Sequence, residues 1–459
     1  MLVLIEIINL IFCLMKLVNT HMIKSTFALL LLLLVTNTNA QTYSLQQCID
    51  TALANNKKLQ ISRNNRQISE QKRKEVQANL FPRIDANGEY KYYVYLPYQL
   101  MPLSTFNPLA PEGQFKEAQF GVPHNINANL QVSMPLYNPQ LYTNISAAKI
   151  AIEMSSLQHK KTEEEVFFEV SNLYYNAQII QNQLAFIDSN INNNKVLLKN
   201  MQLLHSQLLA KQTDVTKIEL QLQQLITQHE LLSNKQEQVL NALKIMMGID
   251  LENNINVEQQ VVFETQPEQT SINNIDIALV QQKTKLLDME LKSIKRSRLP
   301  TLALFGMYGT TGFGYNEQPN EFLNFYPISF GGIKLQYPLF QGLSTQRKIN
   351  QKKLEITNAN LQLEMLNDQT NMHTLNARQQ KIITQKTVEN TKKQAELASK
   401  VYQQILLQQK QGTANLTEVL MADNLLRDAQ QQYLSSIIEY LKAELELKKL
   451  TGNFKTIKN

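Results

Sequence analysis

The sequence predicts a mixed α and β membrane protein made of two internal repeats, each combining a β-hairpin with a long α-helical coiled coil. Three observations support this fold class. Residues 140–247 contain no glycine or proline, and their apolar residues recur at alternating steps of four and three, as in a heptad seam. Two shorter stretches alternate apolar and polar residues with a period of two, which is typical of β-strands. The order of these features then occurs a second time along the chain.

Residues 1–40 are expected to be an export signal, with translation starting at Met22. Lys24 precedes an apolar run at residues 27–35, and a small-residue cleavage site ends at Ala40, as in secretory signal peptides. The alternative is that the apolar stretch before Met22 is translated and anchors the chain in a membrane. No later apolar run reaches the roughly 18 residues of a transmembrane helix. We therefore expect any contact with a membrane to involve another kind of element.

Composition and residue spacing argue against several function classes. The formal net charge of +6 is small for 459 residues and the basic residues do not cluster, so no binding to nucleic acid is predicted. The histidines lack metal-ligand spacing, and no nucleophile lies in a recognisable catalytic motif. We therefore predict no catalytic residues, no metal site, no cofactor and no enzymatic activity. Cys48 is the only cysteine after the signal, which excludes an intrachain disulfide in the mature chain.

The first repeat is expected at residues 41–248. Ser44, followed by Gln47 at the third helical position, predicts a helix start, and Pro82 predicts its end. Gly248 is placed to end the last helix as a C′ residue. The expected elements are a helix at 45–79, a β-hairpin at 83–134, a long helix at about 140–210, and a return helix at 214–247 with Thr213 as its N-cap.

The hairpin at 83–134 has two interpretations. Apolar residues such as Ile84 and Leu130 alternate with polar ones in both strands, and a loop at 96–122 is expected between them. The hairpin could belong to a half-buried soluble sheet, or it could cross a membrane with its apolar side toward lipid. The export signal, the lack of a neighbouring core and a tyrosine cluster at one end favour the membrane. The predicted membrane-interface aromatics are Tyr90, Tyr92 and Tyr95.

The second repeat is expected at residues 271–459, after an irregular linker at 249–270. Later segments recur at offsets of 203 and 204, so the second hairpin has a shorter loop. A register slip in the form of a β-bulge is predicted at Gly331-Gly332. Three pairs of residues share an offset of 218: Pro82 and Pro300, Gly88 and Gly306, Tyr90 and Tyr308. The expected elements are a helix at 271–298, a β-hairpin at 301–337, a long helix at 342–410 and a return helix at 415–451.

The predicted elements have consequences for assembly. A helix of about 70 residues measures about 105 Å, far more than the thickness of a bilayer. The chain has four predicted membrane strands, whereas the smallest single-chain barrels use about eight, and open sheet edges do not occur in lipid. The strands are therefore expected to be shared among two, three or four copies of the chain.

The mature chain resembles the TolC-type outer-membrane efflux family over essentially its whole length. The likeness rests on the opening segment at 43–56, on the helix–proline–strand junctions at Pro82 and Pro300, and on the turn at 412–420. This resemblance implies a homotrimer whose twelve strands form one outer-membrane β-barrel, continued by a coiled-coil tunnel through the periplasm. It also implies contacts with outer-membrane lipid, a periplasmic adaptor protein and an inner-membrane RND or ABC pump.

The resemblance also implies functional residues at the helical turns. In the family, acidic residues of the second return helix narrow the tunnel entrance; Glu418 matches the first of these positions, whereas Met421 stands at the next. Three copies of Glu418 would form an acidic gate, but Asn415 and Glu418 also fit a helix capping box, and both interpretations remain open. Asp214 is the equivalent first-repeat acid, where a helix-cap role is expected. The residues implied at the adaptor-docking tips are Thr213, Gly412, Thr413 and Asn415.

Together, these features predict an outer-membrane channel of a tripartite efflux or type I secretion system. Such a channel passively conducts substrate from an inner-membrane pump across the periplasm and the outer membrane. The alternative is a soluble exported coiled-coil scaffold whose hairpins serve for oligomerisation. The strands bordered by tyrosines favour the channel, and the residues do not identify its cargo.

Overall fold

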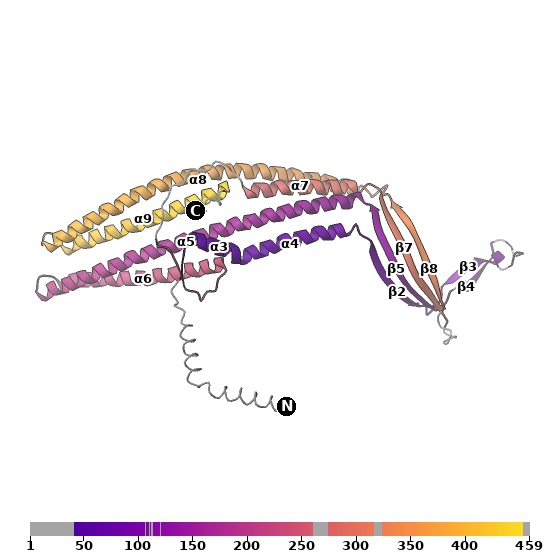
Figure 1. Cartoon of the computed structure of the whole chain (residues 1–459), viewed down its shortest axis with the longest axis horizontal. Helices are drawn as coiled ribbons and strands as arrows, with labels where there is room; N and C mark the ends of the chain where they lie inside the picture. Colours follow the sequence, from indigo (N-terminus) through magenta and orange to yellow (C-terminus); the bar gives the residue numbers. More distant parts are fainter. Residues whose placement is uncertain are drawn as a thin grey trace, which may run out of the picture. The chain divides into compact units, whose positions relative to one another are not determined.

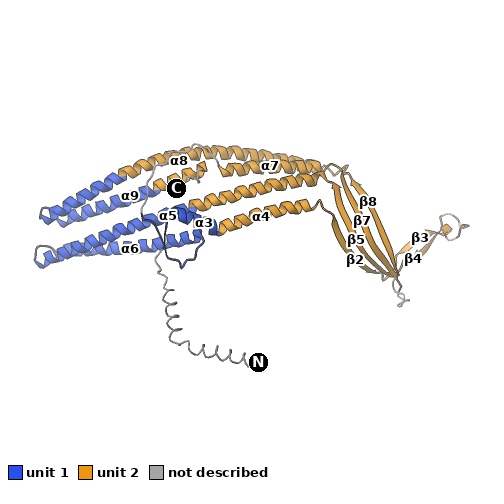
Figure 2. Ribbon diagram, viewed as in Figure 1, with its two compact units in different colours: residues 1–56, 169–265, 391–438 blue, residues 57–168, 266–390, 439–459 orange. Residues whose placement is uncertain are grey.

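The computed structural model describes residues 41–452, with the exception of 106, 110, 112, 120, 260–273 and 316–323. The predicted export signal at 1–40 therefore lies outside the described residues. The chain divides into two compact units, coloured blue and orange in Figure 2. Each unit contains segments of both sequence repeats. Unit 1 comprises residues 1–56, 169–265 and 391–438, and unit 2 comprises residues 57–168, 266–390 and 439–459.

Unit 1 is mainly helical. It contains α3 (Leu45–Asn55), α6 (Gln212–Met247), the C-terminal parts of α5 (Pro139–Ser206) and α8 (Ser344–Lys410), and the N-terminal part of α9 (Leu416–Thr451) (Figure 1). The part of the predicted heptad seam that lies in this unit is buried or half-buried, as expected of a helix–helix contact. Its buried members include Val170, Ala177, Ile218, Leu225 and Leu243.

The helix predicted at 45–79 is in fact two helices, α3 and α4 (Lys57–Ala78), separated by Asn56. The capping box of Ser44 and Gln47 that begins α3 is confirmed. Asn56 has an extended backbone, and its side-chain Nδ2 donates a hydrogen bond to the carbonyl oxygen of Met246 at 2.7 Å. That carbonyl lies in the last turn of α6, where backbone acceptors lack helical partners. The break therefore depends on a contact with a residue distant in sequence.

The linker predicted at 249–270 is not wholly irregular. Gly248 ends α6 with a left-handed φ of 70°, as predicted, but β6 (Ile255–Val257) then pairs in parallel with β1 (Gln41–Tyr43). Ile255 and Val257 are buried, and the residue between them is exposed. A strand of three residues is too short to be distinguished from irregular structure by its pattern, which is why the prediction missed it. Residues 260–273 of the predicted linker lie outside the described residues.

Unit 2 contains a four-stranded antiparallel sheet. The two predicted hairpins are joined edge to edge, because β5 pairs with β7. Within the described chain, β2 and β8 each have a hydrogen-bonded neighbour on one side only. The strands are β2 (Arg83–Tyr92), β5 (His124–Tyr137), β7 (Thr301–Gly314) and β8 (Asn324–Gln336), in the order β2-β5-β7-β8 (Figure 1).

The connection between β2 and β5 corrects the loop predicted at 96–122. It contains β3 (Tyr98–Pro102), the short 3-10 helix η1 (Leu103–Thr105) and β4 (Phe115–Gln119). β3 and β4 pair with each other as a separate antiparallel sheet. Each strand has five residues, and the proline and glycine residues around them favoured a loop in the sequence.

The register of β7 with β8 is continuous, so the slip predicted at Gly331-Gly332 is wrong. Gly332 faces the ring of Phe305, and an added Cβ would lie 3.0 Å from its Cζ. The glycine therefore makes room for an aromatic side chain of the neighbouring strand. The register instead shifts between β5 and β7, at Pro135 and Tyr137, where the proline has no N–H for the ladder.

The helices of unit 2 are α4, α7 (Ile275–Arg296) and segments of α5, α8 and α9. The whole of α5 has 68 residues and the whole of α8 has 67, which corresponds to about 100 Å of helix each. No helix within the described ranges is long and apolar enough to cross a bilayer. On α8, exposed apolar residues recur at multiples of seven: Leu354, Leu361, Leu375 and Ile382.

We expect Gly309→Ala to destabilise the sheet, because a Cβ at this position would lie 2.4 Å from the carbonyl oxygen of Ala128 in β5. Overpacking of this kind costs about 1–3 kcal/mol. Gly306→Ala is the matched control, since its Cβ would meet only the Phe330 carbonyl oxygen, at 3.6 Å. Thermal unfolding followed by circular dichroism compares the two purified variants, and equal midpoints would contradict this expectation.

Candidate functional site

Most of the predicted site residues lie in two helical turns of unit 1 or in the first turns of the helices that follow them. The α5–α6 turn spans residues 207–211, and the α8–α9 turn spans residues 411–415. In the sequence repeat, these turns are equivalent at an offset of 204 residues. The structure shows that the two turns nevertheless differ in their capping and in their exposed side chains.

The α8–α9 turn forms the capping box that the sequence predicts. The Glu418 backbone N–H donates to Asn415 Oδ1 at 3.0 Å, and the Asn415 backbone N–H donates to Glu418 Oε2 at 3.3 Å. Asn415 Nδ2 also donates to Glu418 Oε1, at 3.1 Å. Gly412 has a left-handed φ of 77°, and Thr413 Oγ1 donates to the Gln408 carbonyl oxygen at 3.0 Å. Both carboxylate oxygens of the exposed Glu418 are thus held at the start of α9.

The α5–α6 turn is capped differently. The N-cap of α6 is Lys211, which makes no side-chain cap hydrogen bond. The prediction that Thr213 is the N-cap is therefore wrong. Thr213 is instead a residue of the first turn of α6. Asp214 also lies in this turn instead of at the cap, with its Oδ1 3.8 Å from Lys217 Nζ. An acid in the first turn is still favourable, since the N-terminus is the positive end of the helix dipole.

Leu208 is a residue of this turn that the sequence prediction missed. Its φ is +61°, in the left-handed region that leucine rarely adopts, and its side chain is 91% exposed. The next residue, Leu209, is also exposed. The repeat offset aligns Leu208 with Gly412, which adopts the same conformation without a Cβ. That alignment is the signal that could have identified Leu208 from the sequence.

Further along α9, a buried carboxylate joins three helices of unit 1. Asp423 is 3% exposed, and its Oδ2 accepts a hydrogen bond from Gln221 Nε2 of α6 at 2.7 Å. The same oxygen lies 3.1 Å from Arg427 Nη2. Burial raises the pKa of Asp423, while the charge of Arg427 and hydrogen bonds from Asn194 of α5 and from Gln221 oppose that rise. No local motif marks Asp423, so the sequence did not indicate it.

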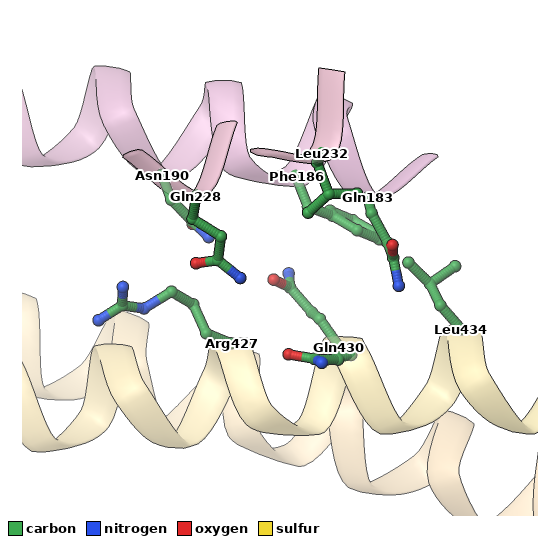
Figure 3. Close-up of a pocket in the computed structure, with 9 residues that line it drawn as sticks. Gln183, Phe186, Asn190, Gln228, Leu232, Arg427, Gln430 and Leu434 are labelled. Atoms are coloured by element: carbon green, nitrogen blue, oxygen red, sulfur yellow. The ribbon is translucent and has the colours of Figure 1, made fainter. Parts of the chain in front are cut away.

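A small cavity lies between α9 and the α5–α6 pair of unit 1, with side chains facing one another across it (Figure 3). Its volume of about 70 Å³ has room for only a few water molecules. No nucleophile or histidine is among the residues that line it, so it offers no catalytic constellation. Amides and Arg427 dominate its lining: Gln183, Phe186, Asn190, Gln228, Leu232, Arg427, Gln430, Gln431 and Leu434.

Unit 2 contains an acidic run at residues 163–165 on α5, close to Asp276 of α7. Lys161 Nζ lies 2.6 Å from Asp276 Oδ1. Burial, followed by the negative charge of Asp276, raises the pKa of Glu164 to about 7. In the part of the chain that the structure describes, no group of three His, Cys, Asp or Glu residues could hold a metal ion. The run therefore contains one carboxyl group with a raised pKa, that of Glu164, and the described residues around it do not form a metal site.

The predicted membrane-interface aromatics lie at the end of β2 and just beyond it. Tyr90, Tyr92 and Tyr95 are all exposed. The hydroxyl of Tyr90 shares a hydrogen bond of 2.7 Å with Nδ1 of His124 in β5. The ring of His124 also lies 4.8 Å from that of Tyr92, its register partner. This end of the β2–β5 pair thus carries exposed aromatic side chains with polar tips.

Comparison with known proteins links this architecture to a family. Residues 48–249, somewhat less than half of the chain, match the model of the outer membrane efflux protein family. The predicted resemblance to outer-membrane efflux proteins is confirmed. The match also confirms the predicted location, the outer membrane. A search of curated proteins found no sequence match.

Solved structures of outer-membrane proteins share the fold of this chain. VceC from Vibrio cholerae matches over 89% of this chain and 96% of its own, with a TM-score of 0.71 and 12% identity. The open state of the MtrE channel from Neisseria gonorrhoeae matches over 89% and 88%, with a TM-score of 0.69 and 16% identity. The CmeC channel from Campylobacter jejuni matches over 89% and 85%, with a TM-score of 0.68 and 14% identity. At these identities the likeness establishes the fold.

We expect Leu208→Gly to leave the stability of the chain unchanged or to raise it by up to about 1 kcal/mol, because glycine adopts a left-handed φ without a Cβ clash. The side chain is so exposed that its removal sacrifices little packing. Gly412→Leu at the equivalent turn is the reciprocal control and is expected to lose about 1 kcal/mol. Chemical denaturation measures both changes. A clear loss of stability in Leu208→Gly would show that the leucine has a structural role.

Proposed function

We propose that the chain is the outer-membrane channel of a tripartite efflux or type I secretion system. Three copies would join their sheets into one twelve-stranded barrel and their helices into a periplasmic tunnel. The channel would conduct substrate passively from an inner-membrane pump to the outside. One observation carries this proposal: a four-stranded sheet with one apolar face and two outer edges that are unpaired within the described chain.

The dimensions and edges of the sheet support a place in lipid. Its strands have 10, 14, 14 and 13 residues, and a tilted transmembrane strand needs about 9–11. In lipid, the free backbone groups of β2 and β8 have to be hydrogen-bonded. Pairing of β8 with β2 of the next copy would satisfy them, and rotational symmetry closes such a ring. Two, three or four copies would meet this need, and the family resemblance favours three.

Helix surfaces of unit 2 support the same assembly. On α8, Leu354 and Leu361 are exposed seven residues apart, and on α4, Ile61 and Ile68 are exposed at the same spacing. Exposed apolar residues at heptad spacing are typical of a seam that lacks its partner helix. Packing of neighbouring copies would cover both seams.

The two turns of unit 1 are proposed to dock a periplasmic adaptor that connects the channel to an RND or ABC pump. Thr213, Gly412, Thr413 and Asn415 would supply polar contacts. Leu208 would add an apolar contact. Its left-handed backbone closes the end of α5, where the Leu209 N–H donates to the Leu204 carbonyl oxygen at 2.8 Å, and binding to a partner would cover its exposed side chain.

The remaining site assignments follow from the same arrangement. Tyr90, Tyr92 and Tyr95 are proposed to lie at the membrane–water interface, where aromatic side chains with polar tips are favoured. Glu418 is proposed to line the channel entrance, with Asp214 as the equivalent acid of the other turn. Because the capping box holds the carboxylate of Glu418 in place, three copies would form an ordered acidic ring that favours cations.

Disulfide crosslinking between copies tests the proposed function. We expect cysteines introduced along β2, at residues 83–92, to crosslink with cysteines along β8, at residues 324–336, and to give a covalent trimer in the outer-membrane fraction. Cys48 is buried and should not interfere. Cysteines in the central strand β5 serve as the control, since both of its edges are occupied within the chain. A protein that is recovered in the soluble fraction, or that forms no trimer, would support the exported scaffold instead.

Single-channel recording tests the role of Glu418. We expect Glu418→Gln to reduce cation selectivity and block by multivalent cations while it preserves stability, because glutamine also completes a capping box. Glu418→Ala should lose the same selectivity and, in addition, about 1 kcal/mol of stability. If both variants select cations as the unmodified channel does, Glu418 caps the helix and does not act as a gate.

A further inference from the structure

We infer that one face of the second hairpin binds the apolar part of amphipathic molecules that pass through the channel. This inference rests on the proposed function and names the chemical class of its cargo. The observations that carry it are the strand register, the contrast between the two hairpins on the same face of the sheet, and the exposure of the side chains concerned.

The strand register assigns every side chain of the sheet to one of two faces, because register partners share a face and successive residues alternate. The first face is apolar in both hairpins, so it is the face that would meet lipid. Its larger members include Ile84, Tyr90, Leu130, Val132, Leu304, Tyr308, Phe325, Ile333 and Leu335. The second face would consequently line the water-filled interior of the proposed barrel.

The second face changes character between the hairpins. One row of register partners contains Asp85, Gln131, Met307 and Phe330 in β2, β5, β7 and β8. Between residues 125 and 131 of β5 and along the facing residues of β2, the first hairpin is polar on this face: Asp85, Asn87, Glu89, Lys91, Asn125, Asn127, Asn129 and Gln131. The second hairpin presents a group that we name the aromatic stripe: Phe305, Met307, Phe313, Tyr326, Ile328 and Phe330.

The fold itself does not require the aromatic stripe. The repeat offsets align Phe305 with Asn87 and Phe330 with Asn127. Both hairpins adopt the same antiparallel pairing although these equivalent positions hold polar residues in one and phenyl rings in the other. The apolar residues of the stripe therefore need an explanation other than strand pairing.

The aromatic stripe is accessible and forms two ring clusters. The ring centroids of Phe305 and Phe330 are 6.3 Å apart, and those of Phe313 and Tyr326 are 6.0 Å apart. Phe330 is 50% exposed and Tyr326 is 56% exposed. Phe313 lies eight positions after Phe305 in β7, which corresponds to about 26 Å along the strand. The stripe thus offers successive apolar contacts to a molecule that moves along the interior.

Four charged side chains of the second face form pairs within the first hairpin, and Lys334 of the second hairpin also lies on this face. Arg83 lies 3.0 Å from Asp85, and Lys91 lies 2.9 Å from Glu89, so these charges neutralise each other in pairs. A molecule with an aromatic or aliphatic moiety would cover stripe surface that otherwise faces water, and its polar part would remain solvated. Several weak contacts in sequence hold such a molecule without trapping it, as conduction requires.

Block of single-channel current tests this inference. Tetraphenylphosphonium serves as the apolar cation and choline as a polar cation of the same charge. We expect tetraphenylphosphonium to block the channel at lower concentration than choline. The double variant Phe305→Asn/Phe330→Asn, which installs the residues of the first repeat, should weaken that block about tenfold and leave the effect of choline unchanged. Asn127→Ser, at the equivalent of Phe330, is the matched control and should leave both unchanged.

Each possible result decides the inference. A conducting channel in which the two cations block equally, or in which the double variant is blocked like the unmodified protein, overturns the inference and leaves the proposed function intact. Absence of any ion conductance overturns the proposed function itself. If the double variant does not assemble, Ile328→Asn is used, with an expected loss of about threefold. A water-soluble thiol reagent should modify the Phe330→Cys variant of the conducting channel. If it does not, chain segments cover the aromatic stripe, and the inference is likewise overturned.

Discussion

The constraint on which this structure depends is that a β-sheet in lipid has to satisfy every backbone hydrogen bond without help from water. Among the described residues, the strands β5 and β7 of unit 2 meet this condition, whereas the outer edges of β2 and β8 do not. An outer-membrane location therefore makes a single copy incomplete. The exposed heptad positions of α4 and α8 point to the same conclusion by a different physical route, since they leave apolar surface without a partner helix. Backbone pairing in the sheet and burial along the helices would thus be completed together by the neighbouring copies of the proposed trimer.

Much of the fold could be predicted because the signals are periodic and long. The seam along α5 and α6, the alternation in β2 and β5, and the glycine that ends α6 each express a local rule. The errors arose where a distant residue decides the local structure. Asn56 interrupts a helical pattern because it caps the end of α6, and Gly332 accommodates the ring of Phe305 instead of marking a bulge. A single sequence read locally contains neither contact.

The same distinction applies to the candidate site. The capping box of Asn415 and Glu418 was predictable because its partners are three residues apart. Thr213 was misassigned because Lys211, the true N-cap, has no side chain that caps a helix. Asp423 and Gln221 are 202 residues apart, and only the folded chain brings them together. Leu208 is an intermediate case: its strain is invisible in one turn alone and becomes evident when the turn is aligned with Gly412.

Comparison of the two repeats separates the requirements of strand pairing and lipid contact from the requirements of the second face. An isolated hairpin would not allow this distinction. The two hairpins share one pairing geometry, and both keep an apolar first face, as a surface in contact with lipid has to be. The second face is not bound by that requirement, and there the hairpins differ at equivalent positions, with asparagine in one and phenylalanine in the other. A requirement of folding or of membrane insertion would act on both hairpins alike. The difference therefore belongs to what the second face contacts, which in the proposed barrel is the interior and the molecules within it.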